Sequence, residues 1–108
     1  DYIRTRVFPG SCVPSASAMI SAAVKNSDLR PTGLHDFGYH YSRTLREWRI
    51  RFLKNEEKIS KLGYDEQFRR AWIYYLCYCE AGFEEGYTGD IHLLLAKPEC
   101  KLGRGFPK

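Results

Sequence analysis

The middle of the chain repeats apolar residues at the spacing of a helix with one buried face. Four of them follow one another at steps of four, three and four: Tyr41, Leu45, Trp48 and Phe52. This period predicts an amphipathic helix. Its opposite face is polar and mostly basic, with Arg43, Glu47, Arg49, Arg51 and Lys54. The pattern lets the helix run on to Lys61, and Gly63 just past that point suits a helix C-terminus.

A second long helix follows directly. Asp65 is a good N-cap, and Glu66 is favourable in the first turn. The apolar stripe of this helix consists of Phe68, Trp72, Tyr75, Cys79 and Phe83. We expect the helix to reach about residue 85, because Gly86 and Gly89 interrupt the pattern there.

The N-terminal part of the chain predicts a loop and one short helix. Pro9, Gly10 and Pro14 require a turn or an extended loop within residues 1–14. Ser15 is a suitable N-cap, and the apolar residues after it recur at helical spacing up to about Lys25.

Two segments are candidates for strands. Residues 29–35 contain Pro31 and Gly33, so they predict at most a short edge strand. Residues 91–96 are an apolar run before Pro98, which predicts a strand buried on both faces. Two strands alone do not make a stable sheet, so we expect a larger α/β domain whose other strands precede this segment. Residues 98–108 are polar and are expected to form a flexible tail.

Composition and charge narrow the range of partners. The 108 residues are 44% hydrophobic and 15% aromatic, which is enough for a packed core. The net charge is +4, and the surplus lies between Arg43 and Lys58. A basic bias of this size fits an anionic membrane surface or nucleic acid, and it equally fits an ordinary solvated helix face. No apolar run is long enough to span a bilayer.

The cysteines and histidines do not form a metal-binding pattern. The cysteines are Cys12, Cys77, Cys79 and Cys100. On a helix Cys77 and Cys79 lie about 200° apart, which disfavours their binding one metal ion. No C-x-x-C or paired histidine spacing is present, so no metal site is predicted. Reduced cysteines of a cytosolic protein are the favoured interpretation.

Tyr41 is the residue whose position admits two interpretations. It opens a predicted helix directly after Gly38, so its phenol can point into a cleft while its ring packs on Leu45. The alternative is a half-buried core tyrosine, which is the interpretation that the apolar pattern alone favours. The chain has no Gly-rich nucleotide loop and no G-x-S-x-G motif, so no local pattern is catalytic by itself.

Four segments of the chain form motifs that follow one another in a fixed order. The first is Phe8-Pro9-Gly10 followed by Val13-Pro14-Ser15. The second runs from Phe37-Gly38-x-x-Tyr41 through Thr44-Leu45-x-x-Trp48 to Phe52, and the third from Gly63-Tyr64-Asp65-Glu66 to Ala81-Gly82-Phe83. The fourth is Tyr87-x-Gly89-Asp90 with the strand after it. In order and spacing these segments resemble the cyclopropane-fatty-acyl-phospholipid synthases, and the first is similar to their F-P-G-G-x-L-P-S turn.

This resemblance covers residues 1–97. The departures are Ser11 and Cys12, which stand where the family usually has glycine. The resemblance implies that residues 1–97 are the C-terminal segment of a class I S-adenosylmethionine-dependent methyltransferase. That Rossmann-like α/β fold has a mostly parallel sheet and an antiparallel last strand. The cofactor-binding loop then lies outside this segment, so the segment alone is expected to be inactive.

The resemblance also implies a reaction and a site residue. A methyl group passes from S-adenosylmethionine to the double bond of an unsaturated phospholipid acyl chain, leaving either a cyclopropane ring or a methyl branch. A bound bicarbonate takes a proton in the family, and Tyr41 matches the tyrosine that donates it a hydrogen bond. The other bicarbonate ligands of the family have no counterpart among the cysteines and histidines here.

The expected partners and location follow from the same resemblance. They are membrane phospholipid acyl chains and an anionic membrane surface, with no nucleic acid, in a cytoplasmic protein peripheral to the membrane. A homodimer is a further expectation. The alternative of another class is a basic helical module that binds membrane or a protein partner and performs no chemistry. The coding sequence before Asp1 would discriminate between the two.

Overall fold

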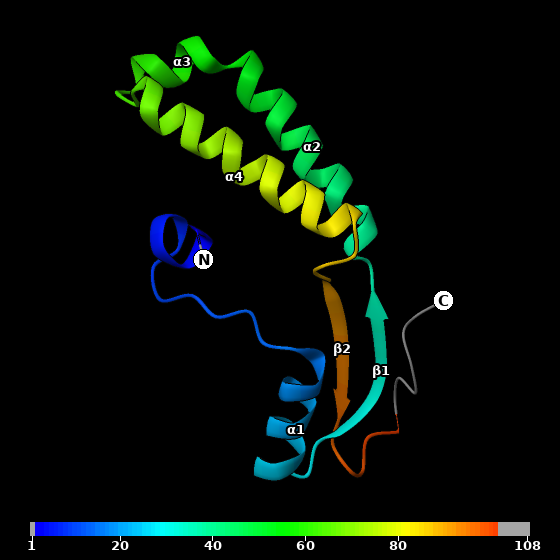
Figure 1. The fold of residues 1–108 in the computed structure, drawn as a ribbon. Helices are drawn as coiled ribbons and strands as arrows, with labels where there is room; N and C mark the ends of the chain where they lie inside the picture. Colours follow the sequence, from blue (N-terminus) through cyan, green and yellow to red (C-terminus); the bar gives the residue numbers. More distant parts are fainter. Residues whose placement is uncertain (1, 102–108) are drawn as a thin grey trace. The chain divides into compact units, whose positions relative to one another are not determined.

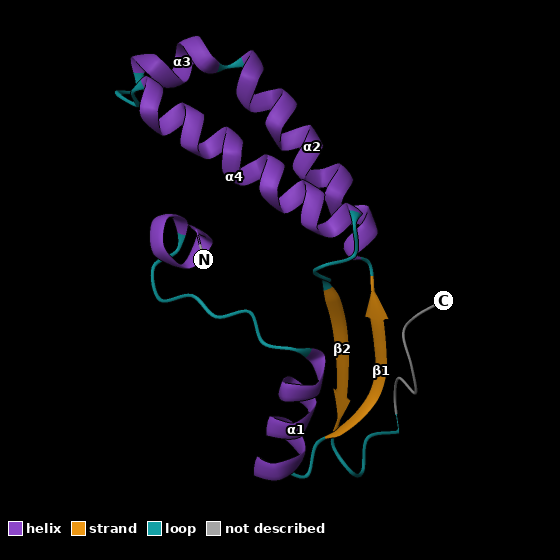
Figure 2. Ribbon diagram, viewed as in Figure 1, coloured by secondary structure: helices purple, strands orange, loops and turns teal. Residues whose placement is uncertain are grey.

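The computed structural model describes residues 2–101, and these are mostly helical with two short strands, as predicted. The element order is η1, α1, β1, α2, α3, α4 and β2 (Figures 1 and 2). The described chain divides into two compact units. One comprises the residues up to Asp36 together with those from Ile91 onward, and the other is Phe37–Asp90. Residues 102–108 of the predicted polar tail lie outside the described residues.

The N-terminal residues correct the prediction of a loop. Ile3–Val7 form the short π-helix η1, closed by the Phe8 amide, which donates to the Ile3 carbonyl at 2.8 Å. The predicted turn follows it, because the Ser11 amide donates to the Phe8 carbonyl at 3.0 Å. Pro9 and Gly10 occupy its central positions, and Gly10 has a φ of 79°. Proline followed by a glycine with positive φ is the arrangement of a type II turn.

The short helix α1 confirms the prediction and extends it by one residue. It spans Ala16–Asn26, and Ser15 is its N-cap. The Ser15 hydroxyl accepts the Ala18 amide at 3.1 Å, which satisfies one of the free donors of the first turn. Within its unit, α1 contacts β1.

The two strands form an antiparallel pair. β1 spans Arg30–Asp36, displaced by one residue from the predicted range, and β2 spans Ile91–Ala96 as predicted. The register pairs Asp36 with Ile91 and Arg30 with Ala96, and it shifts between Pro31 and Gly33. Proline cannot donate to the ladder, so its presence in β1 together with this irregularity fits the predicted edge strand.

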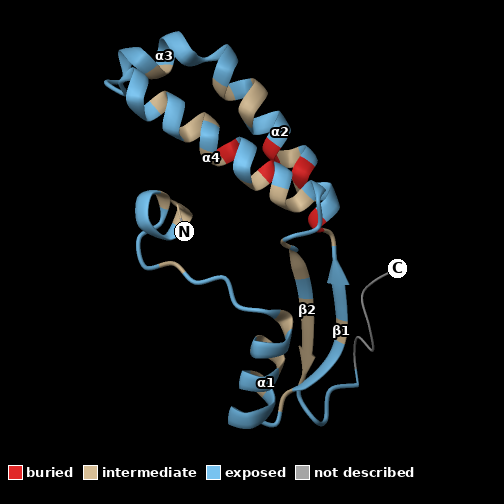
Figure 3. Ribbon diagram, in the orientation of Figure 1, coloured by how far each residue is buried: buried red, intermediate tan, exposed pale blue. Residues whose placement is uncertain are grey.

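The prediction that β2 is buried on both faces is wrong for the described part of the chain. Its His92 is exposed, and its other side chains are only half-buried (Figure 3). The physical reason is that β1 is its single strand neighbour in the sheet that the structure describes. A two-stranded sheet leaves much of the apolar surface of both strands uncovered.

The helices of the second unit correct the prediction that one helix runs to Lys61. α2 spans Gly38–Lys54, and α3 spans Glu56–Lys61 after a break at Asn55. The Asn55 side-chain amide donates to the Arg51 carbonyl at 2.7 Å, and its backbone amide donates to the Phe52 carbonyl at 3.1 Å. The side chain of Asn55 thus takes the Arg51 carbonyl, which would accept the Asn55 backbone amide if the helix continued, and α2 ends there. None of the helices in residues 2–101 combines the length and the hydropathy needed to cross a bilayer.

Two predicted helix boundaries are confirmed, the end of the preceding helix at Gly63 and the N-cap of the last helix at Asp65. Gly63 follows α3 with a φ of 101°, which places it in the left-handed region that favours glycine. α4 spans Glu66–Glu84, and its N-cap Asp65 accepts the Phe68 amide at 2.8 Å. Gly86 follows with a φ of 75°, so the helix ends where the sequence predicted.

The core of the second unit lies between α2 and α4, which run side by side (Figures 1 and 3). Leu45 of α2 and Leu76 of α4 are each 1% exposed. Two polar side chains, Ser42 and Glu80, are buried beside them. The Ser42 hydroxyl donates to the Tyr39 carbonyl at 2.7 Å, so its burial leaves no unpaired donor.

The predicted stripes are only partly the core. Leu45 is buried as expected, but Trp48 is 45% exposed, so its assignment to the buried face is wrong. On α4 the fully buried apolar side chain is Leu76, which directly follows Tyr75, the residue that the predicted stripe placed in the core. The aromatic stripe instead forms a flank of stacked rings, in which Phe68 and Trp72 have ring centroids 6.0 Å apart. These aromatic rings pack on one another along α4. The most buried side chains between α2 and α4 are the smaller Leu45 and Leu76.

Candidate functional site

Tyr41 lies in the first turn of α2, where the chain leaves the loop before Gly38. The turn is held by the Phe37 carbonyl, which accepts the His40 amide at 2.9 Å and the Tyr41 amide at 3.3 Å. The Phe37 amide in turn donates to the Asp90 carbonyl at 2.8 Å. The start of α2 is therefore tied to the segment that follows α4, within the same unit.

Two aromatic rings surround the Tyr41 ring. Its centroid lies 4.9 Å from that of Phe83 on α4, at an interplanar angle of 73°. The Trp48 ring lies 6.0 Å away on α2, at 82°. Edge-to-face pairs of this kind contribute about 0.5–1.5 kcal/mol each beyond simple burial. The Tyr41 ring is therefore fixed by packing, which is the pre-organisation that a functional side chain requires.

The electrostatic surroundings keep Tyr41 in its neutral form. Burial raises the pKa of the Tyr41 phenol, and the Asp90 carboxylate and the Cys79 thiol raise it further. Burial likewise raises the pKa of Tyr75 and of Cys79, which are hydrogen-bonded to one another. A tyrosine with its ordinary pKa is already protonated at neutral pH, and these surroundings favour the same neutral form, in which the phenol can donate a hydrogen bond.

The described residues fit a bicarbonate ion only in part. Tyr41 offers one neutral donor, and the Asp90 carboxylate is the charged group that raises the pKa of its phenol. The nearby Asp90 carboxylate disfavours a second negative charge at this place. Any such anion would therefore depend on donors beyond those described.

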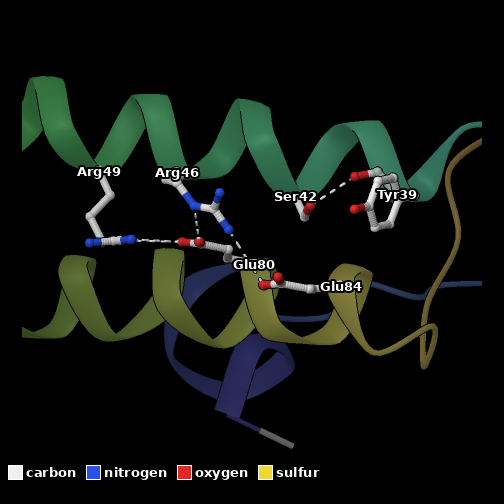
Figure 4. Close-up of polar contacts among 6 residues, drawn as sticks. All are labelled: Tyr39, Ser42, Arg46, Arg49, Glu80 and Glu84. Carbon is white, nitrogen blue, oxygen red and sulfur yellow. Dashed lines mark hydrogen bonds and ion pairs between the residues drawn. The ribbon is translucent and has the colours of Figure 1, made fainter.

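Glu80 of α4 is buried between two arginines of α2 (Figure 4). The Arg46 Nε donates to its Oε1 at 2.8 Å, and the Arg49 Nη2 donates to its Oε2 at 3.1 Å. Burial alone would raise the pKa of the Glu80 carboxyl, but the hydrogen bonds and charges of the two arginines outweigh it, so the pKa lies below its ordinary value. Arg46 also contacts the half-exposed Glu84 at 3.5 Å.

The arginines of α2 therefore divide into two groups. Arg49 was predicted on the solvent face, and that prediction is wrong because its side chain turns to Glu80. Arg43 and Arg51 lie on the outer face of α2 and line a groove of about 270 Å³ with Trp48. Neither of them forms an ion pair within the described part of the chain. The groove also contains one carboxylate, that of Glu47.

The remaining candidate side chains do not come together. The four cysteines, which all lie within residues 2–101, form no disulfide, and Cys12, Cys77 and Cys100 are exposed. Within residues 2–101 no three histidine, cysteine or acidic side chains meet in a group that could hold a metal ion. A second groove, of about 570 Å³, lies among charged residues such as Glu57 and Arg69 of α3 and α4, and Tyr41 does not line it.

Glu80 and Asp90 are the two functional candidates that sequence reasoning missed. The signal for Glu80 was present, since it follows Leu76 by four residues and a core-facing position on a helix recurs at that interval. Asp90 comes near Tyr41 only because the chain returns after α4 to pair with the start of α2. That return is a tertiary contact with no local sequence signature.

Comparison with known proteins identifies relatives for almost the whole chain. Residues 1–93 match the family model of mycolic acid cyclopropane synthetase. A tuberculostearic acid methyltransferase of Mycobacterium tuberculosis is 41% identical over 91 residues, which are 84% of this chain and 21% of that protein. The cyclopropane-fatty-acyl-phospholipid synthase of Escherichia coli K12 is 32% identical over 92 residues, 85% of this chain and 22% of that protein.

A more distant relative acts on another class of lipid. The sphingolipid C9-methyltransferase A of Emericella nidulans is 28% identical over 96 residues, which are 89% of this chain and 18% of that protein. The chain thus spans about a fifth of the length of each of these three relatives. Because the family model matches most of the sequence, the chain belongs to the mycolic acid cyclopropane synthetase family.

Proposed function

We propose that this chain acts as one segment of an S-adenosylmethionine-dependent methyltransferase that modifies unsaturated phospholipid acyl chains. The product is either a cyclopropane ring or a methyl branch at the double bond. The observation that carries the proposal is the neutral phenol of Tyr41, held between Phe83 and Trp48 at a position that matches the family's tyrosine. The names of three relatives, each a lipid methyltransferase or synthase, support the class of reaction.

The proposal places this chain in a class I methyltransferase fold. The antiparallel pairing of β1 and β2 fits the last strand of such a sheet. β2 is apolar but only half-buried among the described residues, which fits a strand that pairs with further strands of a larger sheet. In this arrangement β1 is the edge strand, and its mostly exposed side chains agree with that place.

Within this function Tyr41 has the role of a hydrogen-bond donor. S-adenosylmethionine, bound outside this segment, supplies the methyl group. The Tyr41 phenol keeps its proton and would donate one hydrogen bond to a bicarbonate, the proton acceptor implied by the family. Phe83 and Trp48 fix the direction of the phenol through edge contacts. The rest of the anion site would come from outside the described residues.

A chimera tests the proposed function. Residues 1–97 replace the matching segment of the Mycobacterium tuberculosis relative, with the same graft into the Escherichia coli synthase as a second host. We expect transfer of a labelled methyl group from S-adenosylmethionine to vesicles of an unsaturated phospholipid, and the product identifies ring or branch. The 108-residue chain alone is expected neither to bind S-adenosylmethionine in calorimetry nor to transfer the label. A folded chimera that binds S-adenosylmethionine but transfers nothing would contradict the proposal and favour the non-catalytic module.

We further propose that the outer face of α2 contacts an anionic membrane surface. Arg43 and Arg51 have no acidic partner in the described chain, and the exposed Trp48 beside them is a residue type enriched at membrane interfaces. The protein would then be cytoplasmic and peripheral to the membrane. Two copies would be expected to associate through the open edge that β1 forms in this arrangement.

Vesicle binding tests the membrane contact. Replacing both Arg43 and Arg51 by glutamine is expected to weaken binding to phosphatidylglycerol-containing vesicles about 30-fold, because each arginine near such a surface contributes on the order of 1 kcal/mol. The double replacement of Lys61 and Arg70 by glutamine removes the same charge elsewhere in the unit and is the control. Equal losses in the two variants, or equal binding to neutral phosphatidylcholine vesicles, would show that this face is not the contact.

A further inference from the structure

Glu80 is a carboxylate with an unusual setting, because its side chain is 10% exposed and bridges two helices. Its Oε1 accepts the Arg46 Nε, and its Oε2 accepts both the Nε and the Nη2 of Arg49, at 3.3 and 3.1 Å (Figure 4). Arg46 and Arg49 are three residues apart on α2, so they lie on one face about one turn apart. One carboxylate is thus held at two points along the helix axis.

This arrangement restricts two motions of α2 relative to α4. Sliding along the axis would lengthen one of the two ion pairs, and rotation about the axis would carry both arginines away from the carboxylate. Leu45 and Leu76 pack beside the bridge, but apolar contacts are not directional and tolerate small shifts. The bridge is therefore a directional contact that holds the register of the two helices, and it is more buried than the other ion pair between them, that of Arg46 with Glu84 at 3.5 Å.

The register of the two helices decides where the Tyr41 ring lies. Tyr41 precedes Arg46 by five residues on α2, a distance of about 7.5 Å along a helix. Phe83 follows Glu80 by three residues on α4, and its ring centroid lies 4.9 Å from that of Tyr41. A shift of α2 at the bridge is carried by the rigid helix to the contact between Tyr41 and Phe83.

We propose that Glu80 is a positioning residue, which holds the Tyr41 phenol in place by locking α2 to α4 through Arg46 and Arg49. The inference rests on the proposed function of Tyr41. A role in stability alone is a weaker explanation, because only the carboxylate is buried, while the Arg46 and Arg49 side chains are 45% and 28% exposed, and ion pairs open to solvent contribute little to stability. Fixing register is the best supported use of such buried charges.

The test compares variants in the chimera described above. Glu80→Leu and Glu80→Gln are expected to lower kcat for methyl transfer at least tenfold with KM changed less than twofold, because a displacement of about 1 Å can reduce a rate by 10²-fold. Glu80→Asp should restore part of the rate. Glu84→Gln removes the exposed partner of the same Arg46 and is the matched control, with kcat within twofold of the parent.

A spectroscopic readout separates this inference from the proposed function. In ring-labelled tyrosine NMR spectra, the Tyr41 signal is assigned by its loss in the Tyr41→Phe variant, and Glu80→Leu should shift it because the Phe83 ring no longer faces it. An unshifted Tyr41 signal in folded Glu80→Leu, or a kcat within twofold of the parent, would overturn the positioning role. If Tyr41→Phe itself retains full turnover, the proposed role of Tyr41 fails and the inference fails with it, whatever the Glu80 variants do.

Discussion

Replacing Tyr41 by phenylalanine is expected to reduce methyl transfer by the chimera about 10²-fold or more, the usual effect of losing one pre-organised hydrogen-bond donor from an active site. The ring contacts with Phe83 and Trp48 do not involve the hydroxyl, so they persist in the variant. The free energy of unfolding should therefore change by less than about 1 kcal/mol. Loss of rate without loss of stability is the signature of a residue that acts in the reaction.

The measurement is single-turnover methyl transfer together with urea unfolding of the same variant. Tyr39→Phe is the matched control, because Tyr39 lies in the same turn of α2 and is 73% exposed. It should leave both quantities unchanged. Turnover of the Tyr41→Phe variant within twofold of the parent would remove Tyr41 from the site and leave it as a half-buried packing residue.

Truncating Leu76 to alanine is expected to produce the largest change in stability, a loss of about 2–5 kcal/mol in the unfolding free energy of the α2–α4 unit. Leu76 is 1% exposed and lies where α4 meets α2. The variant loses the transfer free energy of the removed carbons and leaves a cavity that the facing helix fills only in part. A loss of this size is a large share of the stability of a small domain.

Tryptophan fluorescence during urea unfolding of the 108-residue chain provides the measurement. Both tryptophans, Trp48 and Trp72, belong to the α2–α4 unit, so the signal reports on that unit alone. Leu62→Ala is the control for the same chemical change at a side chain that is 76% exposed, and it should cost less than about 0.5 kcal/mol. Equal effects at Leu76 and Leu62 would show that the two helices do not share a core.

The bounds of the helices were largely predictable, because caps are local. Ser15 and Asp65 each accept an amide three residues ahead, and Gly63 adopts the positive φ that its place after a helix suggests. The break at Asn55 was missed, since an asparagine inside a periodic pattern ends a helix only when its side chain captures a nearby carbonyl. The π-helix at Ile3–Val7 was missed for a similar reason, because a five-residue helix has no period to detect.

Less of the candidate site than of the fold could be predicted from the sequence. Tyr41 was singled out by its place after Gly38 and by family resemblance, and the chain's apolar pattern alone favoured a packing role. The pattern also assigned Trp48 to the core and Arg49 to solvent, whereas the structure exposes part of Trp48 and turns Arg49 inward. The apolar stripe of an amphipathic helix covers a wide arc of its surface. The position of the neighbouring helix decides which residues of that stripe are buried in the contact between the two helices.

The sequence by itself determined the order of the two strands and of helices α1, α2 and α4, the caps, the mostly helical character and the family, because these depend on neighbours along the chain and on motifs in order. Only the tertiary structure decided that Leu76 forms the core, that Glu80 bridges Arg46 and Arg49, and that Asp90 lies near Tyr41. The reason is physical: a buried charge is stable only where partners from another element reach it, and that meeting is set by the packing of two helices.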